Sequence, residues 1–500
     1  MSFLMKIWKR FRGIWETPKY ISQKVARGTI LNFSEKIVTK SVLFVRTIIL
    51  ARILFPGDFG LFSMATIALA ASGSILQTGF NQALVYEKSS SRRILDTAWT
   101  FNVLRGFLIS LVVFFIAAPL AGNFFNNPGI ILFVRALAIL ALLDGLENIG
   151  VLLFDKELQY NKKFWFNTIS TTLRVVVVIL AALILRNAWA LVIGAIAGRV
   201  FFLVLSYIIH PYRPRLTIDW FVVRRLFKYG KWIFVSGVIT FLVSRGDAAV
   251  IGRLLDPSSL GFYHLALGLG LMPAVEIVKT LSGLLFPLYS KIRGDYARMK
   301  NVFIRVSRVV FLIILPASLG LIAIGKDAVG LIYGPKWLPM VPILYVVVIY
   351  GLIKAFELIS KPLFMGIGKP KIPTIITIIQ VIVIFSFLVP LINMYGAVGA
   401  AMAITLGMLV SQVIFLFRLK KEINLGFKSI LGSIYLPLIS STGMFLAIFA
   451  LKKFISISNL GLLIGYMIFG VVVYSFFVII LDKIFGHQIK RSYLWIKENL

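Results

Sequence analysis

Basic side chains recur inside long apolar stretches of this 500-residue sequence, where a charge is costly. A Lys or Arg at the centre of a membrane-spanning helix costs roughly 2.5 to 3.5 kcal/mol on insertion scales, so such residues should line water or pair with acids. The twelve basic residues are Lys36, Lys40, Arg46, Arg105, Arg135, Arg174, Arg199, Arg245, Lys279, Arg305, Arg308 and Lys354. The principal acids nearby are Glu35, Asp144, Glu147, Asp247, Glu276 and Glu357.

This excess of basic over acidic residues indicates a binding site for an anion. An Arg guanidinium is planar and offers paired donors to carboxylate or phosphate oxygens, so a cationic cavity suits a diphosphate or an acidic sugar. The alternative for each side chain is snorkelling to a lipid headgroup, which we favour for Arg305 and Arg308. The deeper candidates for binding substrate are Arg46, Arg135, Arg174, Arg245 and Asp247.

Several other chemistries are disfavoured. Cysteine is absent and the three histidines lack metal-ligand spacing, so neither a metal site nor a cofactor is expected. Gly268 and Gly270 are not followed by the GK[ST] of a phosphate-binding loop, which disfavours direct ATP coupling. The formal charge of +34 is spread over short connectors rather than one soluble domain, so no nucleic-acid partner is expected.

The elements that must position these side chains are predicted to be membrane-spanning helices. The sequence is 59% hydrophobic and 14% charged, and apolar runs of about 20 residues recur, each long enough to cross a bilayer. We therefore predict an all-α polytopic membrane protein with about 14 transmembrane helices. The spans fall near 28–51, 59–79, 98–121, 130–153, 164–185, 188–209, 230–252, 260–286, 303–324, 338–359, 372–392, 396–417, 431–451 and 460–481. A basic, Trp-containing segment at 1–27 precedes them and is typical of a helix lying on anionic membrane lipids.

The connectors between these spans alternate in basic content. Residues 122–128 and 393–395 contain no Lys or Arg, whereas 213–228, 291–300, 361–371 and 420–428 are rich in them. Because basic loops remain in the cytoplasm, this pattern predicts a multi-pass protein of the cytoplasmic membrane with both termini cytoplasmic. One basic pair, Lys452 and Lys453, falls on the opposite side.

An internal repeat appears at an offset of 201 residues. Residues 51–65 read ARILFPGDFGLFSMA and residues 252–266 read GRLLDPSSLGFYHLA, which aligns Arg52 with Arg253, Pro56 with Pro257 and Gly60 with Gly261. Generic turn chemistry could produce part of this match. Six spans separate the copies, so we expect two six-helix lobes of like orientation, at 28–215 and 216–425, with a substrate cavity between them. Residues 426–500 would add two further helices and a basic tail.

The span pattern and the segment FVRTIILARILFPGDFG at 44–60 resemble the polysaccharide-transport (Wzx-type) flippases of the multidrug/oligosaccharidyl-lipid/polysaccharide exporter superfamily. The resemblance covers essentially the whole chain. It implies alternating-access transport of a polyprenyl-diphosphate-linked oligosaccharide, with a proton or sodium ion as a possible coupling ion. Lipid II flippases are more distant; Arg46 and Arg52 resemble their two arginines near the end of the first span, which adds Arg52 to the candidate binding residues. Thr47 stands where their acid would be.

Two other functions are compatible with a polytopic membrane protein. A multidrug cation antiporter of the same superfamily would need acids rather than arginines in its cavity. A membrane polysaccharide polymerase or ligase would need a large external loop, whereas the longest outer connector here is about a dozen residues, at 325–337. The sequence therefore favours a transporter that is not an enzyme.

Overall fold

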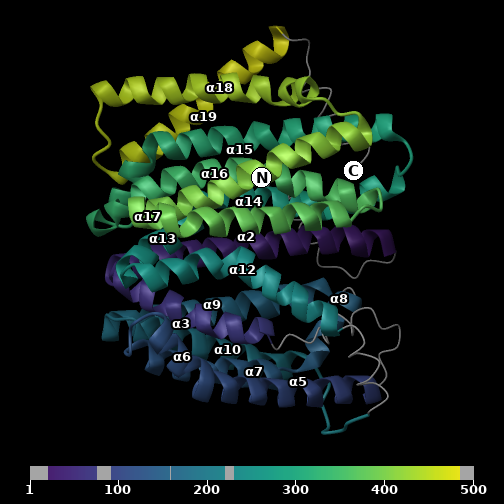
Figure 1. The fold of residues 1–500 in the computed structure, drawn as a ribbon, viewed down its shortest axis with the longest axis vertical. Coiled ribbons are helices and arrows are strands. Elements are labelled where there is room, and N and C mark those ends of the chain that lie inside the picture. Colours follow the sequence, from purple (N-terminus) through teal and green to yellow (C-terminus); the bar gives the residue numbers. More distant parts are fainter. Residues whose placement is uncertain (1–20, 76–91, 158, 220–229, 485–500) are drawn as a thin grey trace, which may run out of the picture. The chain divides into compact units, whose positions relative to one another are not determined.

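The computed structural model describes residues 21–75, 92–157, 159–219 and 230–484 (Figure 1). The first 20 residues of the predicted interfacial segment 1–27, and the basic tail from 485, lie outside these ranges. The long helices are α2 (Ile21–Ile53), α3 (Pro56–Ile75), α5 (Arg92–Val112), α7 (Ile130–Leu146), α9 (Tyr160–Leu185), α10 (Trp189–Ile209), α12 (Gly230–Leu254), α13 (Pro257–Gly270), α14 (Met272–Lys291), α15 (Tyr296–Ile332), α16 (Val341–Gly366), α17 (Lys371–Ile423), α18 (Phe427–Phe454) and α19 (Leu460–Ile484). Shorter helical turns are a π turn (Val113–Ala117) leading into α6 (Ala118–Phe124), 3-10 turns at Ile149–Leu152 and Pro335–Met340, and α8 (Leu153–Lys156).

This helical architecture confirms the predicted fold class. Within the described ranges, nine helices are long and apolar enough to cross a membrane. The other predicted spans also lie on helices, except that residues 76–79 of the span predicted at 59–79 are outside the described ranges. Of their helices, α2 carries several charges and α7 has 17 residues. The 53-residue α17 is one of the nine and contains two predicted spans.

Several predicted spans have different boundaries in the structure, and two of the differences have a clear cause in the backbone. The span predicted at 130–153 ends at Leu146, because Asn148 leaves the helix and its buried side chain accepts a hydrogen bond from the Gly150 amide at 2.9 Å. The span predicted at 260–286 begins earlier, at Pro257, and is interrupted at Leu271. Pro273 lies two residues beyond this break and has no amide hydrogen to continue the helical bonding.

The described chain forms two compact units: residues 1–54 with 61–241, and residues 55–60 with 242–500. In the first unit, α2 packs on α9, α9 on α10, α10 on α7 and α7 on α5. Glycines allow close approach at the last of these contacts. A Cβ on Gly106 would lie 2.5 Å from the Ala141 oxygen, and one on Gly145 would lie 2.5 Å from the Asn102 oxygen. The two backbones can therefore touch only because both residues lack side chains.

An extended segment at 210–219, here named the strap, lies along the first turns of α5. Asp96 of α5 accepts hydrogen bonds from the Tyr212 hydroxyl and, at 3.1 Å, from the Arg215 amide. The Thr217 amide donates to Thr100 Oγ1 at 3.1 Å. These bonds satisfy strap amides that have no strand partner.

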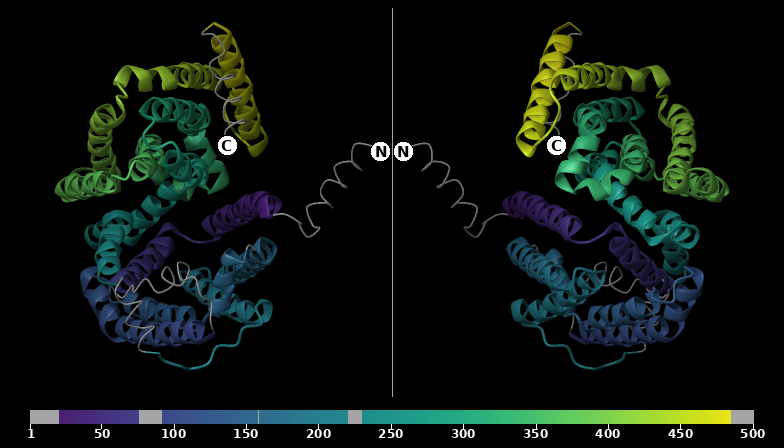
Figure 2. Two further views of the ribbon diagram at one scale, coloured as in Figure 1. Left: turned by 90° about the vertical axis from the view of Figure 1, so that its right-hand side faces the viewer. Right: turned by 90° about the vertical axis from the view of Figure 1, so that its left-hand side faces the viewer.

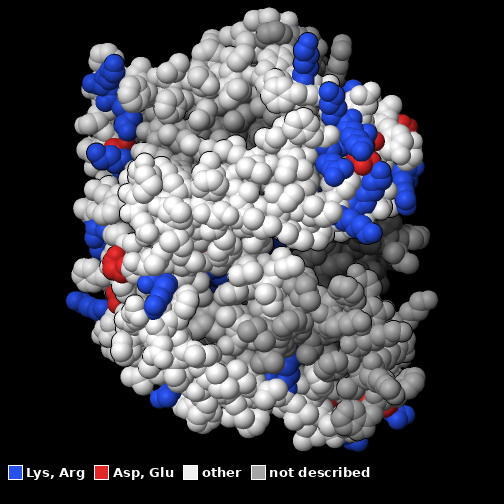
Figure 3. Space-filling model, viewed as in Figure 1, with Lys and Arg blue, Asp and Glu red and all other residues white. Residues whose placement is uncertain are grey.

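In the second unit, α16 packs against α13, α14, α15 and α17 and supplies much of the core. The last two helices lie at the periphery of this unit, with α18 against α15 and α19 against both (Figures 1 and 2). On the face shown in Figure 3, Lys and Arg gather near helix ends, and a broad white area between them carries almost no charged side chains. Lys452 is one of the two lysines on the side of the membrane predicted to be poor in basic residues. It forms an ion pair with Asp327 at 2.5 Å.

The longest helix, α17, folds back on itself at Gly396, whose φ of 58° and ψ of −138° are accessible only to glycine without strain. The arms before and after this break pack antiparallel. A Cβ on Gly399 would lie 1.9 Å from the Leu391 oxygen, and Gln380 contacts Met408. These two arms are the spans predicted at 372–392 and 396–417.

The repeated turns meet within the second unit. Pro56 begins α3 and Pro257 begins α13. A Cβ on Gly60 would lie 1.7 Å from the Pro257 oxygen, and a Cβ on Gly261 would lie 2.0 Å from the Pro56 oxygen. Each copy of the repeat therefore packs its glycine on the proline carbonyl of the other copy.

Candidate functional site

Four arginines of the first unit form a row that follows the order in which their helices pack. Arg46 comes from α2, Arg174 from α9, Arg199 from α10 and Arg105 from α5. Arg46 lies within electrostatic range of Arg174, and Arg174 lies within range of Arg199. We call these four residues the arginine row. It draws charges from four helices to one region of the unit.

Small residues make room for the row. A Cβ on Gly198 of α10 would lie 2.3 Å from Cδ of Arg174, so this glycine lets the aliphatic stem of Arg174 lie along α10. A Cβ on Gly194, one turn earlier, would overlap Val178 of α9 at 2.4 Å. The close α9–α10 contact thus places Arg174 beside Arg199 rather than out among lipid.

Two acids of α7 and its end accompany the row. Arg199 Nε donates to Asp144 Oδ1 at 2.5 Å, and Arg105 attracts the same carboxylate from the other side. Glu147 lies within electrostatic range of both Arg199 and Asp144. Four guanidinium groups therefore share two carboxyl groups, which leaves the Arg46 and Arg174 end of the row cationic.

Several row nitrogens are buried without a hydrogen-bond partner. Among the described residues, this holds for the Nε–H groups of Arg46, Arg105 and Arg174, and also for Arg135 outside the row. Buried donors in proteins are normally paired, and leaving one unpaired costs roughly 1 to 3 kcal/mol. Unpaired donors on adjacent helices are what a bound polyanion would satisfy.

The six candidate residues from the sequence are distributed unevenly. Arg46 and Arg174 are neighbours in the row. Arg52 is exposed in the last turn of α2. Arg135 lies nine residues before Asp144 on α7, about 13 Å along the axis, and its guanidinium stacks 5.2 Å from the Phe114 ring centre.

Arg245 and Asp247 belong to the second unit, in a separate buried cluster. Asp247 is 9% exposed and accepts hydrogen bonds from the Tyr263 hydroxyl at 2.5 Å and the Ala248 amide at 2.8 Å. Arg245 lies within electrostatic range of Asp247. The side-chain donor to Asp247 is thus a tyrosine on α13.

The same cluster continues onto α16. Lys354 donates to the Tyr350 hydroxyl at 3.0 Å and attracts Asp247, while Glu357 forms an ion pair with Lys361. With Arg245, the cluster holds three basic residues and two acids, so its charges come close to balance. It differs in this respect from the arginine row, and an anion would gain less there.

Sequence reasoning placed Arg199, Arg105, Asp144 and Glu147 among the intramembrane charges but not in the site. The spacing of each residue along its own helix gives no sign of the Arg199–Asp144 pair, because the pair joins α10 to α7. The scarcity of acids was the signal available, because a few acids among many intramembrane arginines should each have an arginine partner.

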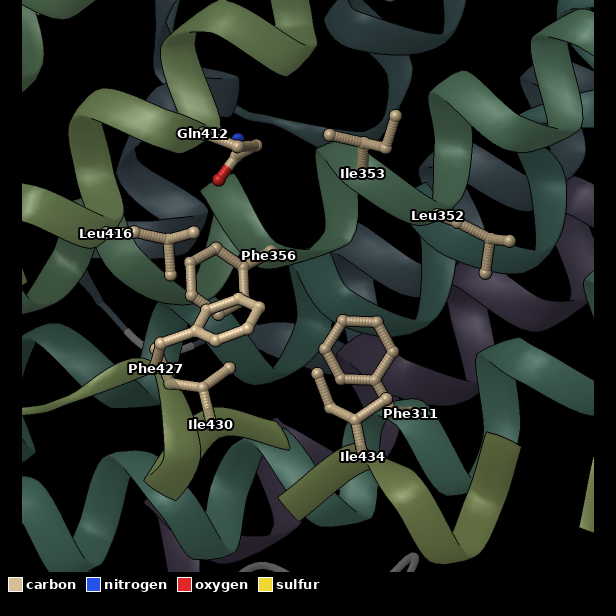
Figure 4. Close-up of a pocket in the computed structure, with 9 residues that line it drawn as sticks. All are labelled: Phe311, Leu352, Ile353, Phe356, Gln412, Leu416, Phe427, Ile430 and Ile434. Carbon is tan, nitrogen blue, oxygen red and sulfur yellow. The ribbon is translucent and has the colours of Figure 1, made fainter. Parts of the chain in front are cut away.

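A pocket of about 290 Å³ in the second unit has a different character (Figure 4). Eight apolar side chains and Gln412 line it, from α15, α16, α17 and the start of α18. Without a charged side chain this lining offers no counter-charge to a diphosphate. No group of three or more acidic, His or Cys side chains that could hold a metal occurs in the described part of the chain.

Residues 49–342 match the model of a family described as "Polysaccharide biosynthesis protein". The chain belongs to this family. It is 24% identical over 428 residues to the lipopolysaccharide biosynthesis protein WzxC of Escherichia coli (strain K12), covering 83% of this chain and 85% of that protein. It is 22% identical to the probable flippase AglR of Haloferax volcanii, covering 94% and 98%. The resemblance seen in the sequence is thereby confirmed at the level of the family.

Two solved transporter structures resemble the fold of this chain. The lipid II flippase MurJ, in an inward closed conformation, superposes with a TM-score of 0.72 at 16% identity, covering 91% of this chain and 98% of that one. An inward-facing MATE-family multidrug transporter of the MOP superfamily gives 0.57 at 14% identity, covering 79% and 99%. The chain is a multi-pass membrane protein with this transporter fold.

Proposed function

We propose that this protein is a flippase that moves a polyprenyl-diphosphate-linked oligosaccharide across the cytoplasmic membrane for cell-surface polysaccharide biosynthesis. Membership of a polysaccharide biosynthesis family and likeness to proteins named as flippases support this function. Transport proceeds by alternating access, with both termini cytoplasmic. The driving force is a proton or sodium gradient or the membrane potential.

The observation that carries the proposal is the arginine row. In the described ranges, three of its four Nε–H groups are buried and unpaired, and Arg174 is the charged neighbour found for Arg46. A diphosphate would bring several oxygens to these donors and relieve the repulsion between Arg46 and Arg174. We assign the diphosphate to this end of the row, and we keep Arg52, Arg135, Arg245 and Asp247 as further substrate contacts.

A multidrug cation antiporter shares the general fold, as the MATE likeness shows. The row disfavours that function, because a cationic drug would add to a charge that is already uncompensated. Polymerase or ligase chemistry has no support from the geometry of the row, where arginines outnumber carboxyls.

Glycan export in cells, or translocation of a lipid-linked oligosaccharide in proteoliposomes, tests the proposal with Arg46→Ala. Losing a charge-assisted contact worth roughly 1.5 to 3 kcal/mol should reduce transport about 10- to 100-fold while protein level and thermal stability stay near wild type. Arg46→Lys should recover part of the activity, because an ammonium keeps the charge but loses the planar pair of donors.

Arg308→Ala serves as the control, since Arg308 is a half-buried arginine of α15 outside the row. Its transport should remain within about two-fold of wild type. Normal transport by Arg46→Ala at wild-type expression would remove the row from the pathway. Equal losses in Arg46→Ala and Arg308→Ala would mean that any lost arginine disables the protein.

A further inference from the structure

The ion pair between Asp144 and Arg199 joins two side chains that both remain partly exposed. Each is 40% exposed, although Arg199 Nε and Asp144 Oδ1 are 2.5 Å apart. The Arg199 guanidinium also lies over the Phe202 ring of the same helix, 5.5 Å from the ring centre. The pair is therefore positioned but not sealed, and another anion can reach it.

Asp144 has a second cation available. It lies in the last turn of α7, which packs against α10 on one side and α5 on the other. Arg199 of α10 holds the carboxylate, and Arg105 of α5 attracts it from the opposite helix. The Nε–H of Arg105 is buried and has no hydrogen-bond partner in the described ranges. Asp144 thus lies within electrostatic range of two arginines that come from different helices.

We propose that Asp144 is a built-in counter-anion of the arginine row, which holds Arg199 when the site is empty and yields it to the substrate diphosphate. This inference rests on the proposed function. The diphosphate takes Arg199 together with Arg174 and Arg46, and Asp144 turns to Arg105. On release the carboxylate returns to Arg199.

Such an exchange solves a problem that a purely cationic site would have. Charge pairs are strong in a low-dielectric interior, so an uncompensated row would hold a diphosphate too tightly to release it. A transport site must bind strongly enough to load and weakly enough to unload. By competing for Arg199, Asp144 weakens binding of the substrate and speeds its departure. Its role is in positioning and release rather than in direct substrate contact.

Asp144→Asn tests the proposal because it removes the charge and keeps the shape. Farnesyl diphosphate binding to the purified full chain in detergent, measured by calorimetry with farnesol as the uncharged comparison, should become about 10-fold tighter. In proteoliposomes KM for the lipid-linked oligosaccharide should fall and kcat should fall with it. Asp327→Asn is the matched control: it breaks an ion pair of the same 2.5 Å length in the second unit and should leave Kd unchanged.

Two more variants separate competition from structural support. In an Arg199→Gln background, Asp144→Asn should no longer change the Kd of farnesyl diphosphate. Asp144 and the diphosphate compete for Arg199, and this variant lacks that arginine. Arg105→Gln removes the alternative partner of Asp144 and should weaken farnesyl diphosphate binding about 10-fold at unchanged melting temperature. Arg105→Gln also provides the test if Asp144→Asn does not fold.

The outcomes distinguish the two proposals. If Arg46→Ala loses binding while Asp144→Asn binds no more tightly than wild type, the counter-anion role is wrong and the flippase proposal stands. If Arg105→Gln binds farnesyl diphosphate with the wild-type Kd, Asp144 does not move to Arg105, and the counter-anion role is again wrong. If wild type and Arg46→Ala bind farnesyl diphosphate equally, or neither binds it, the diphosphate site itself is wrong and the inference fails with it.

Discussion

Gly60 faces the carbonyl oxygen of Pro257 so closely that a Cβ atom would lie 1.7 Å from it. The same relationship holds in reverse between Gly261 and Pro56, at 2.0 Å. The two pairs come from segments 201 residues apart that also match in sequence. Reciprocal contacts of this kind are what a repeat related by two-fold pseudosymmetry produces, and they are the strongest support for interpreting the match as a duplication.

Gly60→Ala should destabilise the protein, because the obstructing atoms are backbone and cannot rotate away. Overpacking of this kind costs on the order of 1 to 3 kcal/mol, so the melting temperature in detergent should fall by several degrees. Gly57→Ala is the control in the same turn, since its added Cβ would meet only Ser258 Oγ at 3.4 Å. Equal melting temperatures for the two variants would contradict the close contact.

Charge reversal can test the attachment of α18 to α15. Lys452 Nζ pairs with Asp327 and also donates to the Ala323 oxygen at 3.1 Å, and both side chains of the pair are about one quarter exposed. Asp327→Lys should lower the melting temperature, because two cations then face each other. Adding Lys452→Asp should restore much of the loss. A double variant no more stable than Asp327→Lys would show that the pair contributes nothing.

The absence of cysteine allows topology to be tested without first removing native thiols. Asn123 near the end of α6 lies beside a connector without Lys or Arg, at 122–128. Ser429 at the start of α18 lies beside a Lys-rich connector, at 420–428. From the loop pattern, an impermeant maleimide added to intact cells should label Asn123→Cys and leave Ser429→Cys unlabelled until the cells are opened. Labelling of Ser429→Cys in intact cells would reverse the proposed orientation.

The strap should loosen in acid because of His210, whose Nδ1 accepts a hydrogen bond from the Tyr212 amide at 3.1 Å. Burial lowers the pKa of His210 from its usual 6.5; Glu157 opposes this shift, and Lys162 and Arg213 reinforce it. Because the folded pKa lies below the unfolded one, the unfolded state takes up protons first as the pH falls. The stabilising contribution is complete above about pH 6.5 and declines below it.

A nitroxide attached at Leu216→Cys would report this loosening, since the side chain at 216 is 74% exposed and the label would not disturb the packing. Its mobility in electron paramagnetic resonance should rise as the pH is lowered from 7.5 to 5. His210→Asn keeps an acceptor but does not titrate, so its spectra should not change with pH. A pH response that survives His210→Asn would assign the effect to another group.

Hydropathy predicted the helices well, because each span needs about 20 apolar residues and few other patterns supply them. It failed at Leu146 and Leu271, where the apolar character continues but the helix stops, since an Asn cap and a Pro act on the backbone without changing hydropathy. In the site, the cost of buried charge was enough to single out Arg46 and Arg174. Pairing Asp144 with Arg199 required the order and rotation of the helices, and a single sequence does not contain that information.

The break at Gly396 also bears on how the chain enters the membrane. As one straight helix, the 53 residues of α17 would extend about 80 Å, more than twice the roughly 30 Å of hydrocarbon available. Turned back at Gly396, the two arms form a hairpin whose ends meet, and the Lys369–Glu422 ion pair joins those ends at 2.5 Å. Lys371 and Lys420 must therefore reach the same side of the bilayer together. Two basic clusters that are separate in the sequence thus act as one determinant of orientation when this hairpin is inserted.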